Sequence, residues 1–361
     1  MKKVLFIASH RKDRAPGQRF RFEQYFEFLN ANGYECELSY FLGEYEDRIL
    51  YSKGKFFQKL SIVLKAAWIR WKNVRKRNQY SIIFIFREAF MTGSLFFEKK
   101  FRDSNAKLIF DFDDAIWHLD ISKANRRFSF LKNPSKTGQI IKLCDMVFAG
   151  NSYLANYSKN FCERVVIIPT TIDTDEYIRI RKPETDTVTI GWSGSITTIK
   201  HFEFALPFLR EIKKRYGDKI RIKVIGDASY RNSEFGITGI GWTKQDEIKE
   251  LSDIDIGIMP LPDDEWAKGK CGLKGLQYMA LEIPTIMSPV GVNTEIITDG
   301  INGFLASTTD EWVDKIGKLV DSKSLRTQMG TKARERVLQN YSVHAWQKEY
   351  LRYFDELTSH K

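Results

Sequence analysis

The sequence is most constrained by a strand, loop, helix and strand unit in its second half. An apolar run at Ile254 to Leu261 predicts a buried strand, and the stretch Asp264 to Ala306 follows it. In that stretch a glycine-containing turn leads into a helix, and Pro284 to Met287 predicts the next strand. Lys274 and Gln277 lie three positions apart on the helix face opposite its apolar side, near an N-terminus whose free N–H groups favour a phosphate. The unit predicts a parallel α/β sheet with a cradle for a nucleotide diphosphate.

The same alternation of strands and helices occurs in two separate series along the chain. One series starts with an apolar strand at Val4 to Ala8, and the other starts at Val188 after a polar, proline-bearing stretch. The pattern predicts an α/β fold of two Rossmann-like, doubly wound domains that face each other across a cleft. We expect domains at residues 1–170 and 185–342, a linker at 171–184, and a C-terminal helix at 343–361 that packs back towards the first domain.

The composition indicates a basic protein of a reducing compartment. The 361 residues are enough for two cores, and the net charge of +11 predicts an anionic partner: nucleic acid, an acidic membrane surface or phosphorylated small molecules. The four cysteines lie far apart with no C-x-x-C pair, which predicts neither a zinc site nor a disulfide framework. We therefore expect a cytoplasmic protein with no metal.

One segment, Lys53 to Asn78, is both basic and aromatic. Its apolar side chains recur at helical spacing among lysines and arginines, so the helix has one apolar side and one cationic side. Either it packs on the domain with a solvated face, or it is an interfacial helix attracted to anionic lipid. No apolar run reaches the length of about 18 residues that a spanning helix needs, so any membrane contact is expected to be peripheral.

Charged residues gather where strands of the first domain end. Ligands of wound sheets bind at the carboxyl ends of the strands, and arginine there suits a phosphate on an acceptor because its guanidinium pairs two phosphate oxygens. Taken singly, each arginine is equally well explained as a surface residue. The candidate acceptor-binding residues are Gly17, Arg19, Arg21 and Arg87.

The acidic cluster DFDD, at Asp111, Asp113 and Asp114, ends another of these strands. It has three interpretations: a D-x-D metal site, carboxylates that cap a helix, or an acceptor-side group that orients or deprotonates the attacking hydroxyl. A metal site of this kind belongs to a one-domain fold and leaves the second series unexplained. We prefer the acceptor-side role, with Asp113 or Asp114 as the catalytic residue.

Three stretches of the chain carry a resemblance to a known family. They are the linker IIPTTID, the loop IGWSGSITTIK and the long stretch GLKGLQYMALEIPTIMSPVGVNTEIITDGINGFLA. With them, nearly the whole sequence resembles the GT-B glycosyltransferases of family 4, the retaining enzymes that use nucleotide sugars. The resemblance implies a donor domain at 185–342, an acceptor domain at 1–170, and no cofactor or metal.

The resemblance also implies which residues bind the donor. The diphosphate would lie on the loop after the first strand of the second domain and on a lysine, here Lys200, which also assists catalysis by stabilising the leaving diphosphate. Relatives carry arginine where Ser195 stands, and a pair of glutamates where Gly269 and Gln277 stand, so that glutamine takes the ribose-binding position. The candidate donor-binding residues are Gly194, Ser195, Lys200, Lys270, Gly272, Leu273, Lys274 and Gln277.

The resulting functional hypothesis is transfer of a sugar, with retention, to an acceptor hydroxyl. The first domain's arginines and the basic helix favour a lipid-linked or phosphorylated glycan of cell-surface polysaccharide synthesis as acceptor, reached at the inner face of the membrane. We expect no nucleic-acid partner. The alternatives are a basic protein that binds membrane or nucleic acid without catalysis, and a nucleotide-sugar epimerase of the same fold.

Overall fold

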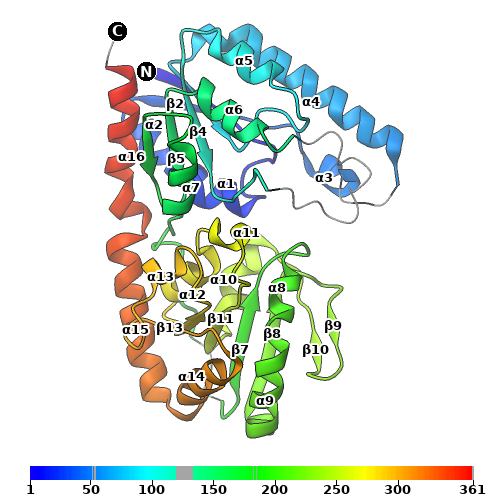
Figure 1. The fold of residues 1–361 in the computed structure, drawn as a ribbon, viewed down its shortest axis with the longest axis vertical. Coiled ribbons are helices and arrows are strands. Elements are labelled where there is room, and N and C mark those ends of the chain that lie inside the picture. Colours follow the sequence, from blue (N-terminus) through cyan, green and yellow to red (C-terminus); the bar gives the residue numbers. More distant parts are fainter. Residues whose placement is uncertain (51, 53, 119–132, 182, 184, 360–361) are drawn as a thin grey trace. The chain divides into compact units, whose positions relative to one another are not determined.

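The computed structural model describes residues 1–50, 52, 54–118, 133–181, 183 and 185–359. The chain divides into two compact units (Figure 1). Unit 1 consists of Met1–Pro169 and Trp346–Lys361, and unit 2 consists of Thr170–Ala345. Each unit is built around its own parallel sheet, and the acidic cluster and the candidate lysines fall in different units.

The sheet of unit 1 has six parallel strands in the order β2-β1-β3-β4-β5-β6. Every residue of β3 is buried, as expected for a parallel strand with helices on both faces. The order reverses between β1 and β3, and ligands of such sheets bind beside that point. The strands are β1 (Lys2–Ile7), β2 (Tyr34–Ser39), β3 (Ile82–Phe86), β4 (Lys107–Phe112), β5 (Met146–Ala149) and β6 (Val165–Ile167).

Helices from both ends of the chain pack on this sheet. The last helix, α16 (Val343–Thr358), buries Tyr350 and Phe354 in unit 1, where the Tyr350 ring stacks on Tyr25 with centroids 4.3 Å apart. The other helices of unit 1 are α1 (Pro16–Arg21), η1 (Glu23–Tyr25), α2 (Phe26–Ala31), α3 (Glu44–Leu50), α4 (Phe56–Lys76), η2 (Arg77–Gln79), α5 (Phe96–Arg102), α6 (Lys136–Leu143) and α7 (Ser152–Ser158).

The main sheet of unit 2 has five parallel strands in the order β13-β12-β11-β7-β8. Its order reverses between β7 and β11. The strands are β7 (Val188–Ser193), β8 (Ile220–Ile225), β11 (Ile256–Met259), β12 (Thr285–Met287) and β13 (Phe304–Leu305), and β9 (Arg231–Asn232) pairs separately with β10 (Ile237–Thr238).

The helices of unit 2 cover this sheet and close its core. Phe208 and Trp312 stack there with ring centroids 4.5 Å apart. The helices are α8 (Ile199–Glu203), α9 (Leu206–Tyr216), η4 (Gly217–Lys219), α10 (Lys244–Ser252), α11 (Glu265–Lys268), α12 (Leu273–Ala280), α13 (Asn293–Ile296), α14 (Thr309–Asp321) and α15 (Lys323–Asn340).

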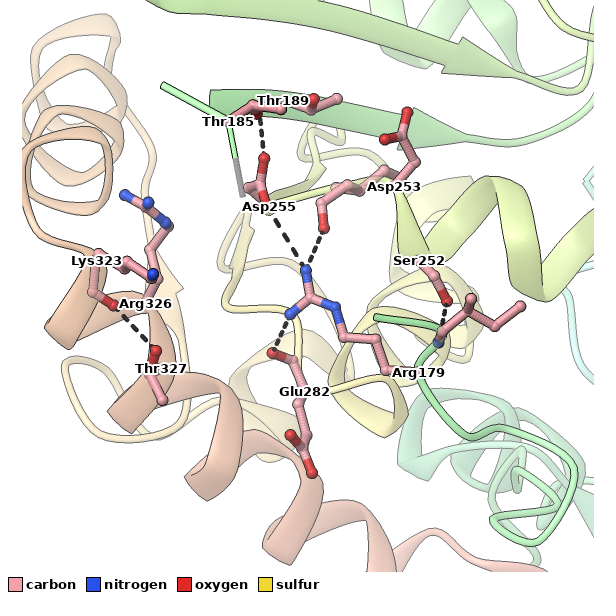
Figure 2. A network of polar contacts seen from close by, with 12 residues as sticks. Arg179, Thr185, Thr189, Ser252, Asp253, Asp255, Glu282, Lys323, Arg326 and Thr327 are labelled. Atoms are coloured by element: carbon pink, nitrogen blue, oxygen red, sulfur yellow. Dashed lines mark hydrogen bonds and ion pairs between the residues drawn. The ribbon is translucent and has the colours of Figure 1, made fainter. Parts of the chain in front are cut away.

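The stretch expected as a linker, 171–184, packs on unit 2 over much of its length. Figure 2 shows Arg179 at the centre of a polar network there. Its Nη2 donates to the backbone oxygen of Ile254 at 2.9 Å, and its Nη1 donates to that of Glu282 at 3.3 Å. The guanidinium also lies 3.8 Å from the Asp255 carboxylate. This part of the stretch is therefore an integral part of unit 2.

Candidate active site

Two loops touch at the carboxyl edge of the unit 2 sheet. Gly194 follows β7, and Gly226 follows β8 with a φ of +121°. A Cβ on Gly226 would lie 2.1 Å from the Gly194 carbonyl oxygen, so only glycine fits. The exposed Ser195 donates its backbone N–H to the Thr198 hydroxyl at 2.9 Å, which closes the turn. The sequence-predicted phosphate loop is thus a tight turn at one side of the strand-order reversal.

Helix α12 starts on the far side of that reversal, after β11. Gly272 stands at its N-cap with a φ of +70°, and a Cβ there would lie 2.3 Å from the Ile296 side chain. Leu273 and Lys274 form the first turn, which contains no acidic residue. The positive end of the helix dipole is therefore not offset by a carboxylate within that turn.

The charges of three candidate lysines act on His201 of α8. The imidazole is 3% exposed, and its Nδ1 has no hydrogen-bond partner among the described residues. Burial lowers the pKa of His201 to about 4, and the charges of Lys274, Lys270 and Lys200 add to the shift. A neutral histidine next to lysine side chains suits a region that binds an anion through the lysines.

Aromatic rings hold two of these lysines. The Lys274 ammonium lies 4.8 Å from the ring centroid of Trp192, which is buried, and the Lys270 ammonium lies 4.8 Å from that of Trp266. Cation–π contacts of this kind orient an ammonium without neutralising it, because a ring carries no net charge. These contacts therefore orient both side chains and leave their charges unchanged.

Gln277 lies in a different environment from the one that its sequence position predicts. It was expected on the polar face of the helix beside Lys274, but it is buried. Its Nε2 donates to the Tyr177 hydroxyl at 2.9 Å and to Glu247 Oε1 at 3.1 Å. The placement on an open face is wrong because Tyr177, from the stretch expected as a linker, and α10 cover this side of α12.

Glu247 contacts the candidate site residue Gln277, and the sequence did not identify it. It is buried, accepts from the Tyr177 hydroxyl at 2.7 Å and from Trp242 Nε1 at 2.8 Å, and also accepts from Gln277. Nothing in the sequence around it, KQDEIKELS, distinguishes it from the exposed acids of a surface helix. The cluster of Tyr177, Trp242, Glu247 and Gln277 is called the Glu247 network below.

In unit 1, four candidate residues meet where the strand order reverses. Arg87, after β3, has a φ of +63° and donates to Asp113 Oδ1 at 2.6 and 2.9 Å and to Asp114 Oδ2 at 2.7 Å. A Cβ on Gly17 would lie 2.8 Å from Asp113 Oδ2. One guanidinium therefore joins both carboxylates beside the first residues of α1.

The other two candidate arginines are buried. Arg21 and Asp111 are both 0% exposed and form an ion pair in the core, with Nε 3.2 Å from Oδ2, and Arg21 also donates to the Ile168 carbonyl. The expectation that Arg21 offers its guanidinium to an acceptor phosphate is not met, because the core ion pair occupies it. Arg19 is 6% exposed, with its guanidinium 4.9 Å from the Phe20 ring centroid.

Two arginines that sequence reasoning did not single out lie on the loop after β1. Arg11 and Arg14 donate to Asp47 Oδ2 at 2.9 and 2.7 Å, and His10 Nδ1 lies 3.1 Å from Oδ1. Although burial opposes the shift, the contacts with His10 and Arg14 lower the pKa of Asp47 to about 2. The two arginine side chains are one third or more exposed, so this loop presents cations at the same sheet edge.

The described residues contain neither a metal-binding cluster nor a membrane-spanning helix. Among these residues no group of three or more His, Cys, Asp or Glu side chains is placed to hold a metal ion. Within the same part of the chain, no helix combines the length and apolarity needed to cross a bilayer.

Comparisons with known proteins relate the second unit to a family model and the whole chain to known structures. Residues 187–322 match the family model described as glycosyl transferases group 1. A search of curated proteins by sequence finds no match. Similar solved structures include the sucrose-phosphate synthase of Thermosynechococcus elongatus, with a TM-score of 0.73, 13% identity and 100% of both chains covered.

Two further structures agree in fold over almost their full length. A glycosyltransferase from Rickettsia africae has a TM-score of 0.69 and 16% identity, with 100% of this chain and 99% of that chain covered. Anabaena Alr3699/HepE, solved with UDP and glucose, has a TM-score of 0.67 and 12% identity, with 99% of this chain and 100% of that chain covered. The chain therefore has the GT-B fold, and its residues 187–322 match the glycosyl transferases group 1 domain.

Proposed function

We propose that the protein transfers a sugar, with retention of configuration, from a nucleotide-diphosphate sugar to a hydroxyl of a phosphorylated or lipid-linked glycan, as in the synthesis of a cell-surface polysaccharide. The observation that carries the proposal is that Lys200, Lys270 and Lys274 follow the carboxyl ends of β7 and β11, the two strands beside the strand-order reversal of unit 2, with Lys274 in the first turn of α12. Anabaena HepE has been solved with UDP and with UDP-glucose, which supports a donor of this class.

On the donor side, the three lysines would stabilise the leaving diphosphate. Negative charge grows on the diphosphate as its bond to the sugar breaks, and fixed cations favour that state over the intact donor. The backbone N–H groups at Leu273 and Lys274 would add the helix dipole. The turn at Gly194 and Ser195 has no side chain large enough to exclude a phosphate. Gln277 would position α12 through the Glu247 network.

On the acceptor side, the Arg87 cluster contains two carboxylates, whose oxygens accept hydrogen bonds. Asp113 and Asp114 would therefore orient a sugar hydroxyl and polarise its O–H bond. Gly17 would leave room beside Asp113. An anionic part of the acceptor would instead meet Arg11 and Arg14, whose charges exceed that of Asp47. In a retaining reaction on one face, the leaving phosphate would accept the proton.

Binding and turnover test the proposal separately. Calorimetry and thermal shift with UDP, GDP and TDP should show one preferred nucleotide, and the corresponding nucleoside should bind far more weakly because it lacks the diphosphate. Transfer from UDP-, GDP- and TDP-sugars to an extracted glycolipid fraction, followed by proton NMR of the product, should show the donor's anomeric configuration. No thermal response and no turnover with any donor would refute the proposal, and an altered sugar without acceptor would indicate an epimerase.

A further inference from the structure

Helix α4 keeps a row of large apolar side chains exposed, and only the last of them, Trp71, also stacks on a ring of its own unit, that of Phe96. Phe57, Leu60, Leu64, Trp68 and Trp71 are between 42% and 83% exposed. Their spacings of three and four residues align them on one face over about 21 Å of helix. On the opposite face the helix buries Lys59, Ile62, Ala66, Arg70, Asn73 and Val74. A surface helix ordinarily buries its apolar stripe, so an outward stripe indicates a docking surface.

The net charge of the chain is concentrated in the segment of the sequence that contains this helix. Residues 48–87 contain eleven lysines and arginines and no acid, while the chain has 57 Lys and Arg against 46 Asp and Glu. Outside the segment, therefore, positive and negative residues are equal in number. The Lys72 ammonium lies 3.4 Å from the Trp68 ring centroid, and Arg75 and Lys76 are exposed in the last turn. The stripe thus has a cationic border and two tryptophans, as interfacial helices have.

We infer that the outward face of α4 docks flat onto a bilayer that contains anionic lipid. The apolar side chains would enter the boundary between headgroups and acyl chains, and the bordering cations would pair with lipid phosphates. A nucleic acid would neutralise the cations but would leave Phe57, Leu60 and Leu64 in water. A second copy of the chain would bring two strongly cationic helices together. Anionic lipid is the partner that accounts for both the apolar stripe and its cationic border.

Contacts beneath the helix connect this docking face to the proposed acceptor loops. Arg70 is fully buried and donates to the backbone oxygens of Ala8 and Ala89, each at 2.6 Å. Ala8 directly follows β1, and Ala89 lies two residues after Arg87. On α4, Lys65 also pairs at 2.5 Å with Glu46 of α3, the helix whose Asp47 holds the loop after β1. The docking helix and the acceptor loops therefore form one connected layer.

This connection specifies the acceptor class, and in that respect it depends on the proposed function. A protein held at the bilayer through α4 would keep the loops that carry Arg11, Arg14 and Arg87 next to the lipid surface. The acceptor would then be a glycan on a lipid carrier, presented from the membrane. The docking itself does not require that any sugar is transferred.

Vesicle flotation at low salt tests the docking directly. The full-length protein should float with vesicles of phosphatidylcholine and phosphatidylglycerol and not with phosphatidylcholine alone. Leu64→Ser and Trp68→Ser should each weaken binding about tenfold, and Arg75→Gln and Lys76→Gln about fivefold each. Exposed residues of unit 2 supply matched controls, in which Ile301→Ser, Leu338→Ser, Lys214→Gln and Lys219→Gln should leave binding unchanged.

Three results would overturn the inference: no flotation with anionic vesicles, equal flotation of the stripe variants and the wild type, or a dimer in sedimentation that the stripe variants abolish. A nucleotide thermal shift on the same preparations separates this inference from the proposed function. Protein that responds to nucleotide but does not float refutes the docking alone. Protein that floats but shows neither nucleotide response nor turnover refutes the transferase proposal alone.

Discussion

The Glu247 network makes position 277 sensitive to a single change of charge. Gln277 Nε2 lies 3.1 Å from Glu247 Oε1 inside unit 2, and both side chains are buried. The variant Gln277→Glu restores the residue that the family resemblance predicts here, yet it would place a second carboxylate against the first. At an effective dielectric constant of about 20, two charges about 3 Å apart repel by about 5 kcal/mol.

Uptake of a proton limits that cost. Protonating a glutamate with an ordinary pKa near 4.3 costs about 3.7 kcal/mol at pH 7, which is less than the repulsion, and about 1 kcal/mol at pH 5. In the variant, the folded pair therefore has a raised pKa, and the folded state binds more protons than the unfolded state. Stability falls as pH rises above the unfolded pKa. We expect a loss of about 3 to 4 kcal/mol at pH 7 that shrinks to about 1 kcal/mol at pH 5.

Urea unfolding followed by tryptophan fluorescence measures this loss at both pH values, and Trp242 reports on the network itself. Gln245→Glu, on the exposed face of α10, is the matched control and should change stability by no more than about 0.5 kcal/mol. The exchange Glu247→Gln with Gln277→Glu should recover most of the loss, because it restores one carboxylate and one amide. A loss of equal size at pH 5 and pH 7, or none at pH 7, would refute the electrostatic reasoning.

Three further variants test the donor-side geometry. Lys274→Gln should weaken UDP binding about 10- to 100-fold in calorimetry. The half-buried Lys268, which pairs with Glu265, supplies the control, because Lys268→Gln should not weaken binding; equal effects would contradict the assigned site. His201→Gln should flatten the acid side of the stability profile. In the wild type, the pKa near 4 means that the folded protein disfavours the protonated imidazole. The free energy of unfolding should therefore fall as pH drops from about 6.5 towards 4, by up to about 1.4 kcal/mol per pH unit. An unchanged slope in the variant would contradict this role of His201. Gly226→Ala should lower the melting temperature and nucleotide affinity together, because its methyl group would lie 2.1 Å from the Gly194 oxygen, and a variant with wild-type melting would show that the two loops separate easily.

Local patterns in the sequence predicted the fold because each strand and helix carries its own signal. The two series of alternating elements predicted two parallel sheets, and the GT-B fold is confirmed. The same logic places Lys200, Lys270 and Lys274 at one sheet edge. Lys200 lies 70 or more residues before the other two, yet each lysine follows the carboxyl end of a strand. In a parallel sheet these ends lie at the same edge.

The sequence could not predict which side chains contact one another, because tertiary packing determines these partners. Arg21 looked like a surface phosphate ligand, but a carboxylate 90 positions away, on Asp111, takes its guanidinium into the core. Gln277 looked exposed, but Tyr177 and Glu247 come from separate segments to cover it. No spacing rule connects these positions, so burial and charge pairing in both units became visible only in three dimensions.

The basic helix α4 is a further feature that the sequence predicted only in part. Periodicity in residues 53–78 distinguished an apolar side from a cationic side. It could not say that Ala66 and Arg70 would face the unit while Trp68 and Leu64 face outward. A helix pattern specifies which residues share a face, and only the packed neighbours determine which face is covered.

The path of the chain through α16 has a consequence for the order of folding during synthesis. Tyr350, Phe354 and Leu357 fill the core of unit 1, although they are translated after the whole of unit 2. Unit 2 is a continuous segment that can close its core before α16 is complete. The sheet of unit 1 is synthesised before unit 2 and keeps part of its apolar surface open until α16 has been made. We therefore expect unit 1, although its synthesis starts before that of unit 2, to be completed after unit 2, and its open apolar surface to need protection from aggregation until then.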